Sequence, residues 1–245
     1  MSNPFIQQNI RAISFDLDDT LWDNRPVLMA AEQIVFDWLT SNYSRIGETY
    51  DYESVHTMRH ALAKARPDLR HDMTRLRKEL LRQIADTTGY DDSLVEPAFE
   101  VFIEARHRIT LFDDVLPTLE NLRKRGYLLG ALTNGNASIQ RLGIDHLFDF
   151  SVTAEEAGAA KPDPRMFELA CQRSGVSTRE MVHVGDEPTT DIEGAQSAGI
   201  TAIWMNRGGI EWQMDSPPDA EVRNMSELLD LAGAQHPPGI KSPGR

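Results

Sequence analysis

Two aspartates, Asp16 and Asp18, lie two residues apart directly after the apolar segment 10–14. That segment is rich in apolar and β-branched residues, which is typical of a buried strand. In an open α/β sheet, ligands bind at the carboxyl ends of the strands. One carboxylate there can attack an electrophile, while the other protonates the leaving group and later takes a proton from water. The pair predicts Asp16 as a nucleophile and Asp18 as an acid and base, although the pair alone is more readily explained as an acidic turn.

Three further polar sets follow other predicted strands. They are the pair Thr133-Asn134, then Lys161 in a Lys-Pro sequence, then Asp186 with Asp191 five residues later. Each set by itself is also explained by a turn, an exposed loop or a helix cap. Because all of them occur in order at predicted strand ends, a single site is favoured over coincidence.

These side chains suit phosphoryl transfer. A carboxylate that attacks a phosphate dianion meets like-charge repulsion, which a bridging Mg²⁺ cancels. Mg²⁺ prefers oxygen ligands and keeps several waters. We therefore expect it on the carboxylates of Asp16 and Asp186 and on a backbone carbonyl near Asp18. We expect Asp191 and Glu187 behind these ligands, and whether Glu187 reaches the metal through a water stays open.

The remaining polar groups are expected to bind phosphate. Thr133 offers a hydroxyl, and the amides around Asn134 are predicted to lie at a helix N-terminus, which favours an anion. Lys161 adds a fixed positive charge that screens the nucleophile and the phosphate from each other.

The elements that must position this site alternate between strands and helices, which predicts a parallel, doubly wound α/β sheet. The predicted strands cover 10–14, 127–132, 150–152, 181–184 and 199–204. The predicted helices between them cover about 115–125, 165–174 and 189–198.

Residues 24–110 contain no convincing strand and interrupt this alternation after the first strand. Apolar residues at helical spacing predict helices there at about 27–41, 52–65, 72–87 and 94–108. We therefore divide the chain into a sheet core, a helical subdomain and a Pro/Gly-rich tail predicted to be disordered. The expected ranges are 1–22 and 112–232 for the core, 23–111 for the helices, and 233–245 for the tail.

Composition limits the partners. The 245 residues carry a net charge of −13, which argues against a nucleic-acid partner, because such binding depends on basic contacts to phosphate. An anionic substrate must then be held by local basic groups or a metal. No apolar run is long enough to span a bilayer, and Cys171 is the single cysteine. We expect a cytoplasmic protein that acts on a small molecule, without a membrane or nucleic-acid partner.

In its motifs the chain resembles the haloacid dehalogenase-like hydrolase superfamily, in particular its helical-cap phosphatases. The motifs are D-L-D-D-T-L from Asp16, T-N at 133–134, K-P at 161–162 and G-D-x-x-x-x-D from Gly185. The resemblance implies a Rossmann-like core with a mobile helical cap inserted between the first two motifs. It also implies Mg²⁺-dependent phosphatase chemistry through an aspartyl-phosphate on Asp16, with Asp18 as acid and base. Dehalogenases do without that second acid, so Asp18 favours phosphate esters.

Four stretches look more specifically like a bacterial branch that includes flavin mononucleotide phosphatases. They are 16–27, 71–77, 133–137 and 183–191. That branch also dephosphorylates 5-amino-6-(5-phosphoribitylamino)uracil, which would place the chain in riboflavin biosynthesis. The resemblance implies substrate contacts from the cap, for which the candidates are Asn24, Arg25, His71, Arg75 and Arg77. A phosphomutase, another sugar-phosphate phosphatase, and a catalytically silent binding protein on the same fold remain alternatives.

Overall fold

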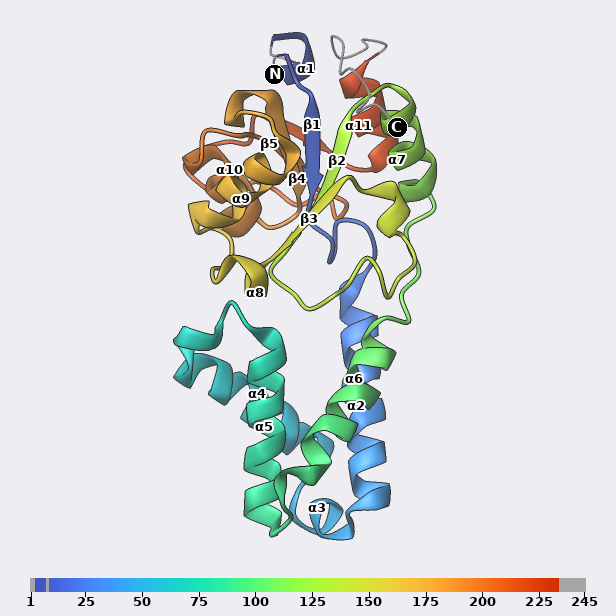
Figure 1. The fold of residues 1–245 in the computed structure, drawn as a ribbon, viewed down its shortest axis with the longest axis vertical. Helices are drawn as coiled ribbons and strands as arrows, with labels where there is room; N and C mark the ends of the chain where they lie inside the picture. The colour runs from blue at the N-terminus through green and yellow to red at the C-terminus, as the bar shows by residue number, and fades with distance from the viewer. Residues whose placement is uncertain (1–2, 8, 234–245) are drawn as a thin grey trace.

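The computed structural model describes residues 3–7 and 9–233 (Figure 1). The predicted tail, apart from its first residue, Gly233, lies outside the described residues. Within the described part, no helix combines the length and hydropathy needed to span a membrane.

The core of the fold is a six-stranded parallel sheet with the order β3-β2-β1-β4-β5-β6. Its strands are β1 (Ala12–Phe15), β2 (Leu128–Thr133), β3 (Phe150–Thr153), β4 (Met181–Gly185), β5 (Thr201–Met205) and β6 (Ala220–Val222). This confirms the predicted α/β class. In the register, Phe15 at the end of β1 lies opposite Ala131 of β2 and Val184 of β4. The residues that follow these three strands therefore meet at one edge of the sheet.

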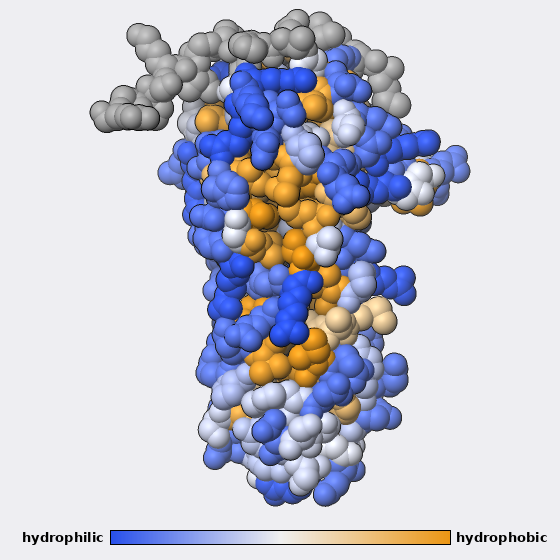
Figure 2. Space-filling view, turned by 90° about the vertical axis from the view of Figure 1, so that its right-hand side faces the viewer, coloured by the Kyte–Doolittle hydropathy of each residue, from blue (hydrophilic) through white to orange (hydrophobic). Residues whose placement is uncertain are grey.

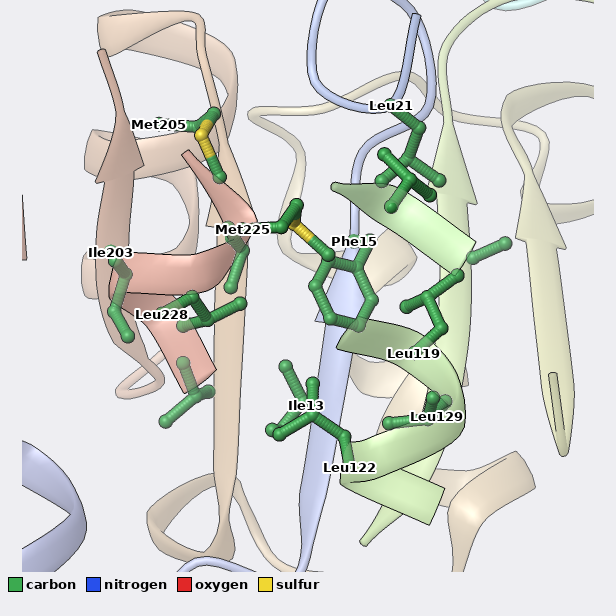
Figure 3. Close-up of a cluster of buried hydrophobic side chains, with 14 of the residues drawn as sticks. Ile13, Phe15, Leu21, Leu119, Leu122, Leu129, Ile203, Met205, Met225 and Leu228 are labelled. Atoms are coloured by element: carbon green, nitrogen blue, oxygen red, sulfur yellow. The ribbon is translucent and has the colours of Figure 1, made fainter. Parts of the chain in front are cut away.

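Helices cover both faces of the sheet because side chains alternate along each strand. From β1, Ile13 and Phe15 pack in one cluster with α7 (Val115–Lys124) and α11 (Met225–Ala232) (Figure 3). On the other face, Ala12 packs in a second cluster with α9 (Pro164–Ser174) and α10 (Gly194–Ser197). The local sequence sets the ends of α9: Asp163 caps its first turn, and Gly175 ends it at a φ of 69°.

Five helices form a bundle at the far end of the molecule (Figure 1). They are α2 (Asn24–Asn42), α3 (Ser44–Thr49), α4 (Tyr52–Ala65), α5 (Met73–Thr88) and α6 (Val95–Arg106). The bundle has a hydrophobic cluster of its own, distinct from the two clusters on the sheet. On the side of the molecule seen in Figure 2, apolar residues gather in the middle, whereas the lower end, formed by the bundle, is mostly hydrophilic.

The two chain segments that connect the bundle to the sheet lie side by side. Trp22 and Leu111 form an antiparallel bridge, and the Phe112 amide donates to the Leu21 carbonyl at 3.0 Å. The bundle therefore leaves and re-enters the core at almost the same place.

Several elements differ from the sequence prediction. The helices α3 and α11 and the strand β6 were not predicted; α3 has six residues and β6 three, too few for a periodic signal. The helix predicted at 189–198 begins instead as a π-helical segment, Pro188–Glu193. Residues 134–144 contain no helix, so the expectation of a helix N-terminus at Asn134 was wrong.

Two further short helices lie outside the bundle: α1 (Pro4–Gln7), which precedes β1, and α8 (Ala154–Ala157), which directly follows β3. Short 3₁₀ segments cover Pro67–Leu69, Asp92–Leu94, Asp145–Leu147 and Thr178–Glu180.

Candidate active site

Lys161 lies at the centre of the site. Its ammonium donates to Asp16 Oδ1 and to Asp191 Oδ1, each at 2.6 Å, and to the Leu132 carbonyl at 2.9 Å. Only 3% of the residue is exposed. The three acceptors come from the ends of β1 and β2 and from the segment after β4. The lysine predicted from sequence thus joins three strand ends.

The charges around Lys161 are not equivalent. Burial alone would lower the lysine's pKa, but the carboxylates of Asp16 and Asp191 outweigh it and raise that pKa above its usual range. Burial would raise the pKa of Asp191, yet the pairing with Lys161 and the contact with His183 hold it well below its usual range. For Asp16, burial dominates and raises the pKa well above normal, only partly offset by Lys161. Asp191 is therefore the stable counter-ion of the lysine, and Asp16 is the carboxylate whose negative charge is disfavoured by burial.

Asp191 is fixed by contacts on both oxygens. His183 Nε2 lies 3.3 Å from Oδ1, and the Glu187 amide donates to Oδ2 at 3.0 Å. A side chain at Gly185 would collide with this arrangement, because an added Cβ would lie 2.3 Å from Asp191 Cγ. Glycine at the end of β4 therefore allows Asp191 to fold back against the strand.

Behind Asp191 lies a buried polar pair that sequence reasoning missed. His183 Nδ1 and the Ser14 hydroxyl lie 2.9 Å apart on neighbouring strands, and neither residue is exposed. Burial lowers the pKa of His183, which favours the neutral ring. The available signal was a polar residue at an interior position of each apolar strand.

Asp186 lies at the end of β4 and accepts a hydrogen bond from the Thr20 hydroxyl at 3.0 Å. Burial, together with the charge of Asp191, raises the pKa of Asp186 to about 7. Oxygens of Asp16, Asp186 and Asp191 come within 4.8 Å of one another. Both oxygens of Asp191 already have protein partners, so Asp16 and Asp186 are the carboxylates available to an ion.

This donor set fits a hard divalent cation such as Mg²⁺, which is bound in proteins through one or two carboxylates and waters. Burial raises the pKa of both Asp16 and Asp186, so ionising both carboxyls is costly, and a bound cation would lower that cost. Glu187 is exposed and its carboxylate accepts from the Thr189 amide at 3.2 Å, as the N-cap of the π-helical segment. A contact of Glu187 with the ion stays a prediction.

Asp18 lies in a different environment from Asp16. Its Oδ1 accepts from Trp22 Nε1 at 3.0 Å and from Arg106 Nη2 at 2.5 Å. Arg106 is the last residue of α6 and is 3% exposed. Nothing in the sequence indicated this contact, because it joins residues 88 positions apart.

The Thr-Asn-Gly segment after β2 lies beside Asp18. The Gly135 amide donates to the Thr133 hydroxyl at 2.9 Å, and a Cβ on Gly135 would come within 2.8 Å of Asp18 Oδ2. The Asn134 side chain clamps the backbone of Lys161, accepting from its amide at 2.7 Å and donating to its carbonyl at 2.9 Å. The structure therefore gives the Asn134 side chain a positioning contact with the lysine.

The five candidate substrate residues of the bundle are not brought together. Asn24 and Arg77 line a pocket of about 160 Å³ that also contains Asp18. Arg25 lines an adjoining pocket of about 430 Å³, whereas His71 and Arg75 line neither. Arg77 is already engaged, with Nη2 at 2.9 Å from Glu32 Oε1 and its guanidinium 4.0 Å from the Phe102 ring centre.

Comparisons with known proteins identify the family to which the chain belongs. A family model described as haloacid dehalogenase-like hydrolase matches residues 10–199. The chain is 33% identical to 5-amino-6-(5-phospho-D-ribitylamino)uracil phosphatase YigB of Escherichia coli, over 91% of this chain and 96% of that protein. It is 34% identical to glyceraldehyde 3-phosphate phosphatase of Methanopyrus kandleri, over 91% and 97%.

Among solved structures, the chain is similar to 2-haloacid dehalogenase from Pseudomonas syringae pv. Tomato DC3000. The TM-score is 0.85 and the identity 41%, over 91% of this chain and 97% of that one. The names of these relatives thus cover two chemistries on one architecture. The family match extends over most of the chain and includes every strand of the site. The chain belongs to the haloacid dehalogenase-like hydrolases.

Proposed function

We propose that the protein is a Mg²⁺-dependent phosphomonoesterase that works through an aspartyl-phosphate on Asp16. The observation that carries the proposal is that Asp16 and Asp18, two residues apart, lie in different environments. Asp16 is buried against the Lys161 ammonium, and Asp18 faces the pocket between the sheet and the bundle. A dehalogenase has no alkoxide to protonate, so a carboxylate in the place of Asp18 favours a phosphatase. The phosphatases among the relatives support the same choice.

In the first step an Asp16 oxygen attacks phosphorus, and the bond from phosphorus to the ester oxygen breaks. Asp18 gives its proton to the departing alkoxide, and the leaving group departs as an alcohol. In the second step water attacks phosphorus, Asp18 takes the water's proton, and the bond to Asp16 breaks, which releases phosphate. Lys161 keeps its charge in both steps and stabilises the charge that develops next to Asp16. When bound at Asp16 and Asp186, Mg²⁺ would supply charge neutralisation for the phosphoryl group.

We further propose that helices α2–α6 act as the cap over this site. The bundle's separate hydrophobic cluster and its adjacent entry and exit segments support the division at about 22–23 and 111–112. Closure of such a cap would exclude water and bring the leaving group against the bundle.

For the substrate we propose a small phosphorylated metabolite, with flavin mononucleotide and 5-amino-6-(5-phospho-D-ribitylamino)uracil as first candidates. The similarity to the Escherichia coli phosphatase supports them. A sugar-phosphate phosphatase is the second candidate, supported by the similarity to glyceraldehyde 3-phosphate phosphatase.

The purified protein is expected to release phosphate from p-nitrophenyl phosphate with Mg²⁺ and to lose that activity with a chelator. The same assay on a panel of phosphorylated metabolites, including flavin mononucleotide and sugar phosphates, ranks the candidates by kcat/KM. Transfer of phosphate to a second hydroxyl without release to water would identify a phosphomutase instead. A protein that turns over no phosphate ester under these conditions would be a binding protein on this fold.

Replacing Asp18 by asparagine is expected to slow the hydrolysis of alkyl phosphates far more than the hydrolysis of p-nitrophenyl phosphate. An alkoxide needs a proton in order to leave, whereas p-nitrophenolate needs little help, so loss of the acid costs about 10²–10⁴-fold on the former. The measurement is the single-turnover rate of each substrate with the wild type and the variant. Equal losses on both would show that Asp18 acts only through the fold.

A further inference from the structure

The pocket beside Asp18, called here the Asp18 pocket, lies between the sheet and the bundle. Its volume is about 160 Å³. The core contributes Asp18, Gly135 and Asn136 to its lining, and α2 and α6 contribute Asn24 and Arg106. If Asp18 protonates the leaving group, as in the proposed function, the atoms next to the ester oxygen must occupy this pocket. The inference below rests on that function.

Two residues that line this pocket each carry a buried polar atom without a hydrogen-bond partner. In the described part of the chain, the buried side-chain atoms without a hydrogen bond are Asn24 Oδ1, Arg59 Nε and Arg106 Nη1. Arg59 Nε still lies 2.8 Å from Glu32 Oε1 as an ion pair. Asn24 Oδ1 has no ion pair, and Arg106 is paired with Asp18 through Nη2, which leaves Nη1 without a hydrogen bond. Both residues line the Asp18 pocket. Unpaired buried polar atoms are rare and destabilising, so we expect each of these two atoms to bind a polar group of a ligand.

The two atoms differ in what they require. Asn24 Oδ1 can only accept a hydrogen bond, and Arg106 Nη1 can only donate one. A hydroxyl group can donate as well as accept, so the hydroxyls of one ligand can satisfy either atom. A carboxylate could accept from Arg106 but could not donate to Asn24, and it would meet the charge of Asp18. An ammonium group could donate to Asn24 but would be repelled by Arg106.

Arg106 is held ready for this contact. Its Nη2 donates to Asp18 Oδ1, and Trp22 Nε1 donates to the same oxygen, so the guanidinium is held in place while Nη1 has no hydrogen-bond partner. The rigid fork of arginine makes two such contacts at once, which the single ammonium of lysine does not reproduce.

We propose that the Asp18 pocket is a hydroxyl-recognition subsite, with Asn24 and Arg106 as specificity residues for phosphate monoesters of polyols. The recognised hydroxyls lie on the carbons beyond the ester carbon. A substrate that lacks them leaves both atoms unpaired in the bound state and is expected to have a lower kcat/KM. Sites that hydrogen-bond a substrate hydroxyl discriminate strongly against the deoxy analogue.

The test compares glycerol 1-phosphate with propyl phosphate, which has the same carbon chain without hydroxyls. The expected preference of the wild type is about 100-fold in kcat/KM. Asn24→Ala and Arg106→Lys are each expected to reduce this ratio at least about tenfold, because one unpaired atom is removed. Matched controls are Asn42→Ala, at the other end of α2, and Arg82→Lys, on α5, which are expected to keep the wild-type ratio.

A binding measurement separates this proposal from the proposed function. The Asp16→Asn protein with Mg²⁺ is titrated with each phosphate ester by calorimetry, and glycerol 1-phosphate is expected to bind at least about tenfold more tightly. The protein could turn over p-nitrophenyl phosphate and yet show no preference for glycerol 1-phosphate over propyl phosphate, either in kcat/KM or in binding. That result would overturn the subsite and leave the phosphatase intact. Variants that lower kcat/KM equally for both substrates would also overturn the subsite, because Arg106 would then act only through Asp18. Preferential binding without any turnover would retain the subsite and overturn the phosphatase.

Discussion

Replacing Asp16 by asparagine is expected to lower the turnover of every phosphate ester by about 10⁵-fold or more, the size seen when an enzyme's nucleophile is removed. Asparagine keeps the shape of the side chain and an oxygen that can accept from Lys161, but its amide cannot form the acyl phosphate. The measurement is phosphate release from p-nitrophenyl phosphate and from an alkyl phosphate at saturating Mg²⁺.

The control is the thermal unfolding of the same variant. Since burial already makes the charged form of Asp16 costly, the neutral amide should be tolerated by the fold. Activity within tenfold of the wild type, in a protein that unfolds at the wild-type temperature, would disprove Asp16 as the nucleophile.

Replacing Lys161 by alanine is expected to lower both activity and stability. The ammonium is the shared counter-ion of Asp16 and Asp191, and its loss leaves two buried carboxylates without a counter-ion. Breaking a buried pair in this way costs about 3–5 kcal/mol in the free energy of unfolding. Loss of the positive charge next to the transferring phosphoryl group should cost about 2.7–4 kcal/mol in barrier, or 10²–10³-fold in kcat, by analogy with oxyanion donors.

The stability loss should depend on pH. In the wild type the depressed pKa of Asp191 stabilises the fold above the carboxylate's ordinary range. Without Lys161, burial raises the pKa of this carboxyl, and a raised folded-state pKa destabilises the fold as the pH rises. In the presence of chelator, the difference in unfolding free energy between wild type and Lys161→Ala should therefore narrow from pH 7 to pH 5. Lys124→Ala, at an exposed lysine, is the control, and an unchanged difference would contradict the pairing.

The strand ends of the candidate site could be predicted because they depend on local sequence. An apolar run followed by Asp16 predicts both the strand and the place of the carboxylate, and the same holds for Asp186 after β4. Lys161 was expected at a strand end but follows helix α8, so that expectation was wrong. Parallel pairing then brings the strand ends together without further information. The contact of the Asn134 side chain with Lys161 was not predicted, because it joins Asn134 to a backbone 27 positions later and not to its neighbours.

The contacts that were missed are all set by tertiary packing. Arg106 reaches Asp18 because α6 ends where the bundle returns to the core, and no pattern in the sequence of α6 marks that residue. His183 and Ser14 face each other because β1 and β4 are neighbours in the sheet order. In the bundle, His71 and Arg75 were selected by resemblance, and they are not among the residues that line the Asp18 pocket.

The meeting of Trp22 and Leu111 has a consequence for how this chain folds. The strands β1 and β2 pair directly, although the whole bundle separates them in sequence, and closing so long a loop costs chain entropy. Helix bundles depend on local contacts and form quickly. If α2–α6 assemble first, their adjacent ends shorten the effective loop between β1 and β2 to a few residues. The inserted helices would then act as an internal template that speeds nucleation of the sheet.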